Sequence, residues 1–140
     1  NKLEQEKEPK VTTTKGLAVY DKKFYLKHYN KKSVEDFFAY VKDVEKIIRA
    51  NKWRLQTKFN KHYCGFKAGI FNAFGIKWIS SKTFVLFFKI SKEETKRRSI
   101  KITKYDPQWK EALCYIEPNK TKVKDFLPLF KAAYEKRAGE

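Results

Sequence analysis

The chain has 140 residues, the length of one typical domain. Its 41% hydrophobic and 16% aromatic residues provide a packed core and exclude a fully disordered chain, while its few glycines and prolines exclude a collagen-like or low-complexity one. The net charge of +17 opposes compactness and points to a polyanionic partner, either a nucleic acid or an anionic membrane face.

Residues 1–15 are expected to form a flexible tail or linker, because Leu3 and Val11 are their only apolar side chains besides a proline. A single α+β domain is expected over residues 16–140. Since the chain lacks Met, we expect a processed product or a domain of a longer protein. The absence of a signal segment and the presence of only two cysteines favour a cytoplasmic location, on the nucleoid if the protein binds DNA.

Short extended or irregular segments are expected over residues 16–29, and the first clear helix over residues 33–51. Ser33 is the expected cap of this helix, with Glu35 and Asp36 in the first turn at the positive end of the helix dipole. The helix is amphipathic, since its apolar residues recur at intervals of three and four. They are Val34, Phe37, Phe38, Val41, Val44, Ile47 and Ile48.

From Trp53 the period changes to two, which predicts a strand over residues 53–59 and a turn at Asn60 and Lys61. A second strand is expected from Tyr63 to Ala68, with Gly65 at a bulge or a close backbone approach. Residues 70–78 are rich in aromatic side chains and are broken by Gly69 and Gly75, which indicates a hairpin there.

The apolar run at residues 83–90 predicts a central strand that is buried on both faces, and it is far too short to cross a membrane. Two more strands are expected at residues 100–103 and 112–116, with turn residues at 106–108 between them. The stretch between residues 90 and 100 has the composition of a loop.

A second amphipathic helix closes the chain between Val123 and Tyr134. Pro128 lies either in its first turn or at a kink. The sequence therefore predicts an α+β fold: a helix, about five mostly antiparallel strands, and a C-terminal helix packed on the sheet.

The positive charge is concentrated in the expected sheet, because residues 46–92 contain eleven Lys or Arg and no acidic residue. Alternation along the strands sends basic and apolar side chains to opposite faces, which leaves one face free to bind phosphates. A Lys-rich surface that only serves solubility is the alternative. The basic residues expected to contact nucleic acid are Lys52, Arg54, Lys58, Lys61, Lys67, Lys77, Lys82, Lys96, Arg97, Arg98, Lys101 and Lys104.

Aromatic residues are interleaved with these cations, and they either stack on unpaired bases or belong to the core. They are Trp53, Phe59, Tyr63, Phe71, Phe74 and Trp78.

Catalytic and metal-binding patterns are weak, so we expect no enzyme activity, no metal and no cofactor. His62 and Cys64 form one close pair, with His28 and Cys114 as their only further partners, and this spacing matches no common zinc site. The sequence Glu94-Thr95-Lys96 has the local form of a nuclease motif but lacks a preceding Asp on a neighbouring strand. An enzyme would need carboxylates such as Asp106, Glu117 and Glu94 to meet in one cleft.

Four segments carry a family resemblance: residues 59–67 (FNKHYCGFK), residues 82–90 (KTFVLFFKI), the turn at Tyr105 and Asp106, and residues 129–134 (LFKAAY). They resemble an uncharacterised prokaryotic α+β domain family that is often appended to the C-terminal side of restriction-endonuclease-like proteins. With the helix from Ser33, the resemblance covers about residues 33–137. It implies an accessory module that handles DNA and has no catalytic residues.

Our functional expectation is a non-catalytic nucleic-acid-binding domain, with duplex DNA favoured over RNA. The alternative is a protein-interaction or docking domain of a larger protein, in which the basic charge serves solubility or an acidic partner. The two differ in whether nucleic acid competes with the partner.

Overall fold

The structure is a computed structural model and describes residues 20–98 and 100–139. The tail or linker expected over residues 1–15 lies outside the described residues. The elements in chain order are α1 (Lys22–His28), α2 (Lys31–Ala50), β1 (Gln56–Phe59), β2 (Tyr63–Ala68), β3 (Phe71–Trp78), β4 (Phe84–Phe88), α3 (Lys92–Arg97), β5 (Lys104–Asp106), β6 (Glu111–Tyr115), the 3-10 turn η1 (Val123–Phe126) and α4 (Leu127–Ala138).

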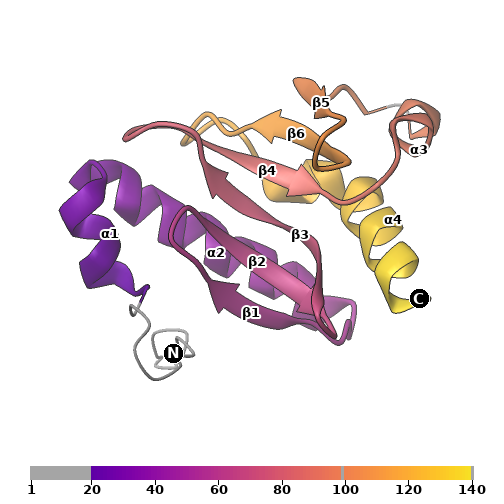
Figure 1. Ribbon diagram of the computed structural model, residues 1–140, viewed down its shortest axis with the longest axis horizontal. Helices are drawn as coiled ribbons and strands as arrows, with labels where there is room; N and C mark the ends of the chain where they lie inside the picture. The colour runs from indigo at the N-terminus through magenta and orange to yellow at the C-terminus, as the bar shows by residue number, and fades with distance from the viewer. Residues whose placement is uncertain (1–19, 99, 140) are drawn as a thin grey trace.

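The strands form one antiparallel sheet in the order β1-β2-β3-β4-β6-β5. Helices α2 and α4 lie behind this sheet in Figure 1, which looks onto the opposite face. We call that opposite face the open face, since no helix of the described residues lies across it in this view. The predicted α+β class is confirmed, and the described residues form six strands in place of about five.

The main core lies between the sheet and the helices, and aromatic rings dominate it. Phe130 of α4 meets Phe74 of β3 and Phe88 of β4 edge-on, at centroid separations of 4.7 and 4.8 Å. Edge-to-face pairs of this kind add to the stabilisation from apolar burial. Strand β4 is buried over its whole length, as expected for a central strand.

Helix α2 begins two residues before the expected start, because Asn30 and not Ser33 is the cap. The Asn30 side chain accepts a hydrogen bond from the Ser33 backbone N–H at 3.1 Å. Asn caps a helix as well as Ser does, so Asn30 can begin the helix three residues before the expected cap. The first turn therefore contains no acidic residue, and Glu35 and Asp36 lie beyond it.

Helix α1 corrects the prediction of extended or irregular structure, because residues 22–28 are helical. Asp21 caps it by accepting a hydrogen bond from the Phe24 N–H at 2.9 Å. Tyr25 is its one buried residue, and its hydroxyl donates to the Asn60 carbonyl of the β1–β2 turn. Residues 16–19 of the expected segment lie outside the described residues.

Several strand limits also differ from the prediction. Strand β1 starts at Gln56, since Trp53 stacks on Tyr134 of α4 at 5.0 Å and so lies outside the ladder. Of the two glycines expected to break the hairpin, Gly69 lies in the turn, with a φ of 71°, whereas β3 is continuous through Gly75. Strand β5 covers residues 104–106, whereas residues 100–103 are not a strand.

Residues 92–97 form helix α3, although the composition of this stretch predicts a loop. Ser91 and Glu94 form a capping box, in which each side chain accepts a hydrogen bond from the other residue's N–H. At the C-terminal end, Pro128 lies in the first turn of α4 rather than at a kink. No helix in the described part of the chain is long and apolar enough to span a bilayer.

Candidate nucleic-acid interface

The open face receives every second side chain of the strands. Lys58, Lys67 and Lys77 point to it from β1, β2 and β3, because their strand neighbours Phe59, Phe66 and Ile76 are buried in the core on the helix side. At the other edge, Lys104 of β5 is opposite Leu113 of β6, which faces the same way. The strands thus spread four lysines across one surface.

A small second cluster of apolar residues forms the floor of the open face between these lysines. It consists of Val85, Phe87 and Leu113, with Tyr63 packed against it. The Phe87 ring lies close to the backbone of β3 because Gly75 has no side chain: a Cβ there would be 2.6 Å from the ring and 2.2 Å from the Cys64 carbonyl oxygen. The glycine therefore serves a close approach that no other residue permits.

Glu111 lies in the middle of the open face and is only 1% exposed. One of its carboxylate oxygens is 2.8 Å from the Lys89 Nζ, and the other contacts the Lys77 Nζ. Both ammonium groups also lie over the Phe87 ring, 5.3 and 5.7 Å from its centroid. A buried carboxylate needs such partners to offset its lost hydration. The group of three carries a net charge of +1.

Trp109 extends this centre towards the β5–β6 turn and is 58% exposed. Its backbone N–H donates to the Asp106 carboxylate at 3.3 Å, and its carbonyl accepts from the Lys89 Nζ at 3.2 Å. The same ammonium lies 5.7 Å from the centre of the Trp109 ring. Lys89 therefore links the exposed indole to Glu111.

A hollow of about 470 Å³ opens on this face. Its lining residues are His62, Tyr63, Asn72, Lys77, Trp78, Phe87, Lys89, Trp109 and Glu111. The Asn72 Oδ1 and the Trp78 Nε1 are buried and have no hydrogen-bond partner among the described residues. The wall thus combines aromatic rings, two ammonium groups and the Glu111 carboxylate.

The twelve basic residues predicted from the sequence do not form one cluster. Four lie on the open face, as above. Lys61 and Lys82 lie in the turns at one end of the sheet, and Lys52 and Arg54 lie just before β1. The remaining four are Lys96, Arg97, Arg98 and Lys101, on α3 and the segment after it.

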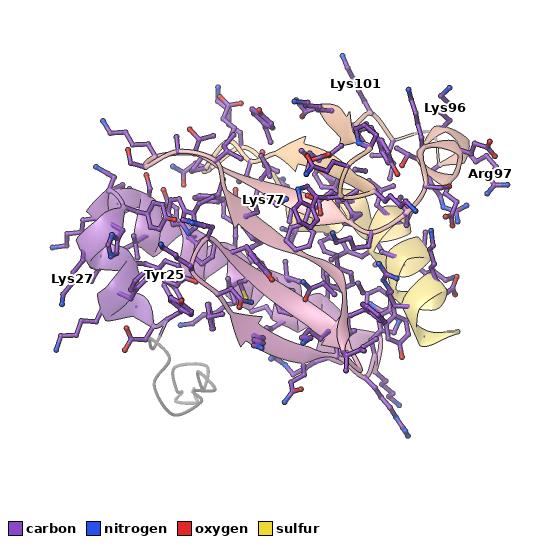
Figure 2. All side chains as sticks on the ribbon, viewed as in Figure 1. Tyr25, Lys27, Lys77, Lys96, Arg97 and Lys101 are labelled. Atoms are coloured by element: carbon purple, nitrogen blue, oxygen red, sulfur yellow. The ribbon has the colours of Figure 1, made fainter. Side chains whose placement is uncertain are left out.

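Figure 2 shows that Lys77 lies near the centre of the sheet, whereas Lys96 and Arg97 project from α3 and Lys101 projects near β5, at the corner of the molecule that α3 and β5 form. Lys27 of α1 lies at the opposite end of the molecule. The chain therefore presents a central basic face and a separate basic corner.

Three residues of the central group were not among the predicted contacts: Lys89, Trp109 and Glu111. Lys89 continues the alternation of β4 by one residue, which is the signal that points to it. Glu111 is joined to Lys77 only through the register of β3, β4 and β6, and local sequence does not contain that register.

Four of the six aromatic residues expected either to stack on bases or to build the core lie in or against the main core. Phe59, Phe74 and Trp78 are buried in the main core, and Trp53 is packed against it. Tyr63 lies on the open face, and Phe71 is 55% exposed at the end of the β2–β3 hairpin.

Of the side chains weighed for catalysis or metal binding, His28 and His62 line one small hollow, whereas both cysteines are buried. Cys64 is buried in the core, and this burial raises the pKa of its thiol well above the usual value. His62 is exposed, and its Nδ1 is 3.0 Å from the Tyr29 hydroxyl. Among the described residues, no group of three or more His, Cys, Asp or Glu is placed to hold a metal ion.

The three carboxylates that an enzyme would need have other partners. Glu94 caps α3 and lies 3.4 Å from Lys136, while Glu117 lies 3.2 Å from Lys120. Asp106 accepts hydrogen bonds within its own turn.

Comparison of the chain with known protein families, curated proteins and solved structures found no match. The resemblance of residues 33–137 to a prokaryotic domain family therefore stays a prediction.

Proposed function

We propose that this protein is a non-catalytic nucleic-acid-binding module and that the open face of its sheet is the binding surface. The observation that carries the proposal is the placement of Lys58, Lys67 and Lys104 around an apolar centre. The carboxylates facing this side from the strands, Glu111 and Asp106, are both engaged by the protein itself. The face therefore attracts phosphates without strong local repulsion.

Binding through these lysines depends on salt. Each lysine that neutralises a phosphate releases condensed counterions, so affinity falls as salt concentration rises. The contacts are to the backbone, which gives little sequence selectivity. The basic corner formed by Lys96, Arg97, Arg98 and Lys101 supplies further phosphate contacts to a ligand long enough to reach it.

The test compares two triple variants of equal charge. The first replaces Lys58, Lys67 and Lys104 by Gln on the open face. The control replaces Lys42, Lys46 and Lys131, which are exposed on the helix side. Fluorescence anisotropy with labelled oligonucleotides gives the affinity at several salt concentrations. We expect the first variant to lose at least about tenfold in affinity and to reduce the salt slope by roughly two units, while the control changes little. Equal losses in both variants would reject the open face as the surface.

A second candidate is a docking module for an acidic protein partner. It is favoured by the end of the β2–β3 hairpin, where Ile70 is 77% and Phe71 is 55% exposed, because neighbouring exposed apolar side chains are typical of protein interfaces. A complex with an acidic protein that excess oligonucleotide does not displace would favour this candidate.

A further inference from the structure

We propose that the open face binds single-stranded rather than duplex nucleic acid, with one unpaired base held in the hollow and stacked on Trp109. This inference rests on the proposed function and specifies its ligand. It differs from the expected preference for duplex DNA, because the arrangement of side chains on the open face, and not the amount of positive charge, determines which form of nucleic acid fits.

The indole of Trp109 is exposed and yet held in place. The Asp106 carboxylate accepts a hydrogen bond from the backbone N–H of Trp109. The Lys89 ammonium donates to the backbone carbonyl of Trp109 and lies over the Trp109 ring. An exposed, positioned ring offers a base a stacking surface at little cost in conformational entropy. In a duplex the faces of the bases are already stacked on each other, so only an unpaired base uses this surface.

A group of polar atoms lies beside the Trp109 ring in the lining of the hollow. Glu111 holds the ammonium groups of Lys77 and Lys89 over Phe87. Lys77 uses one of its three N–H donors in this contact, so the others remain for the carbonyl oxygens of a base. The volume of about 470 Å³ lies within the range of about 300–1,000 Å³ that is typical of small-ligand sites.

The distribution of charge over the open face also favours a single strand. The centre carries one net positive charge, whereas Lys58 and Lys67 on one side and Lys104 on the other are free of ion pairs in the described structure. This arrangement suits a strand that turns a base inward and leaves its phosphates at the rim. A duplex laid on the same face would bring phosphates over the apolar floor formed by Val85, Phe87 and Leu113.

The experiment measures the affinity of the full chain for a labelled 12-nucleotide single strand, as DNA and as RNA, and for the matching duplex. The variants are Trp109→Ala, Trp109→Phe and, as a matched control, Phe71→Ala, which removes an exposed ring outside the hollow. Circular dichroism and urea midpoints establish that each variant is folded.

We expect tighter binding of the single strands than of the duplex. Trp109→Ala should lower single-strand affinity by roughly 5- to 100-fold, Trp109→Phe should retain most of it, and Phe71→Ala should leave it unchanged. If the duplex binds at least as tightly and Trp109→Ala affects neither ligand, the inference is wrong and the proposed function stands. If no oligonucleotide binds, the proposed function itself is wrong.

Discussion

Glu111 is the residue on which the centre of the open face depends. Its carboxylate is almost fully buried, and a buried charge is tolerated only where opposite charges compensate for lost water. Lys77 and Lys89 provide this compensation from two adjacent strands, so the carboxylate joins β3, the end of β4 and β6. The same contact positions both ammonium groups for a ligand.

We predict that Glu111→Gln destabilises the protein by about 2–4 kcal/mol, because it leaves two partly buried ammonium groups without a counter-charge. Urea unfolding followed by tryptophan fluorescence measures this loss. The matched control is Glu117→Gln, whose ion pair with Lys120 is exposed and should contribute no more than about 0.5 kcal/mol. Similar effects of the two variants would contradict this role of Glu111.

The two cysteines, Cys64 and Cys114, are buried and form no disulfide. Burial raises the pKa of Cys64 well above its usual value and that of Cys114 to about 12. Since the thiolate is the reactive form, we predict that neither thiol reacts with a disulfide reagent at pH 8 within the time the native state persists. In urea both should react at once. Rapid labelling of native protein, read by mass spectrometry, would contradict the burial of the labelled residue.

At the scale of the elements, the long and strongly patterned ones are predictable and the short ones are not. The sequence predicts α2 and β4 because each repeats its apolar period over several residues. Helices α1 and α3 have seven and six residues and bury one residue each, so they have almost no period to detect. Their caps, Asp21 and the Ser91–Glu94 box, are the signals that identify them.

Helix α3 depends on this capping box, since six residues are too few for a helix to persist on propensity alone. We predict that Ser91→Ala destabilises α3 by about 1 kcal/mol and speeds exchange of its amide hydrogens roughly fivefold, with little effect on α2. Hydrogen exchange followed by NMR separates the two helices. Equal acceleration in both would mean that the variant destabilises the whole fold and not α3 in particular.

The capping box also makes α3 sensitive to acid. Burial alone would raise the pKa of Glu94, but the Ser91 N–H and the Lys136 ammonium outweigh it and lower the pKa below the usual 4.5. A carboxyl with a lowered native pKa stabilises the fold above its ordinary pKa and loses this contribution as the pH falls through the native value. We predict that the NMR signals of α3 shift towards disordered positions below about pH 4.5. The variant Glu94→Gln should show no such transition.

At the scale of the whole molecule, composition and alternation predict a basic sheet face but not its centre. Lys58, Lys67 and Lys77 each alternate with buried residues along a single strand. This alternation is visible in the sequence, and the strands place the three lysines on the face that it predicts. The contact of Glu111 with Lys77 depends on the order of β3, β4 and β6, which is a property of long-range pairing. The local sequence therefore predicts the basic face but not the hollow at its centre.

The net charge of +17 stores repulsion in the compact state. Raising ionic strength from about 0.01 to 0.15 M shortens the screening length from roughly 30 to 8 Å, so distant lysines cease to repel each other while Glu111 and its close partners are little affected. We predict that Tm rises by a few degrees over this range, although affinity for nucleic acid falls over the same range. The variant lacking Lys58, Lys67 and Lys104 should show a smaller rise, measured by scanning calorimetry in two monovalent salts. A Tm that falls with salt would mean that attractive ion pairs, and not repulsion between lysines, dominate the electrostatics of the fold.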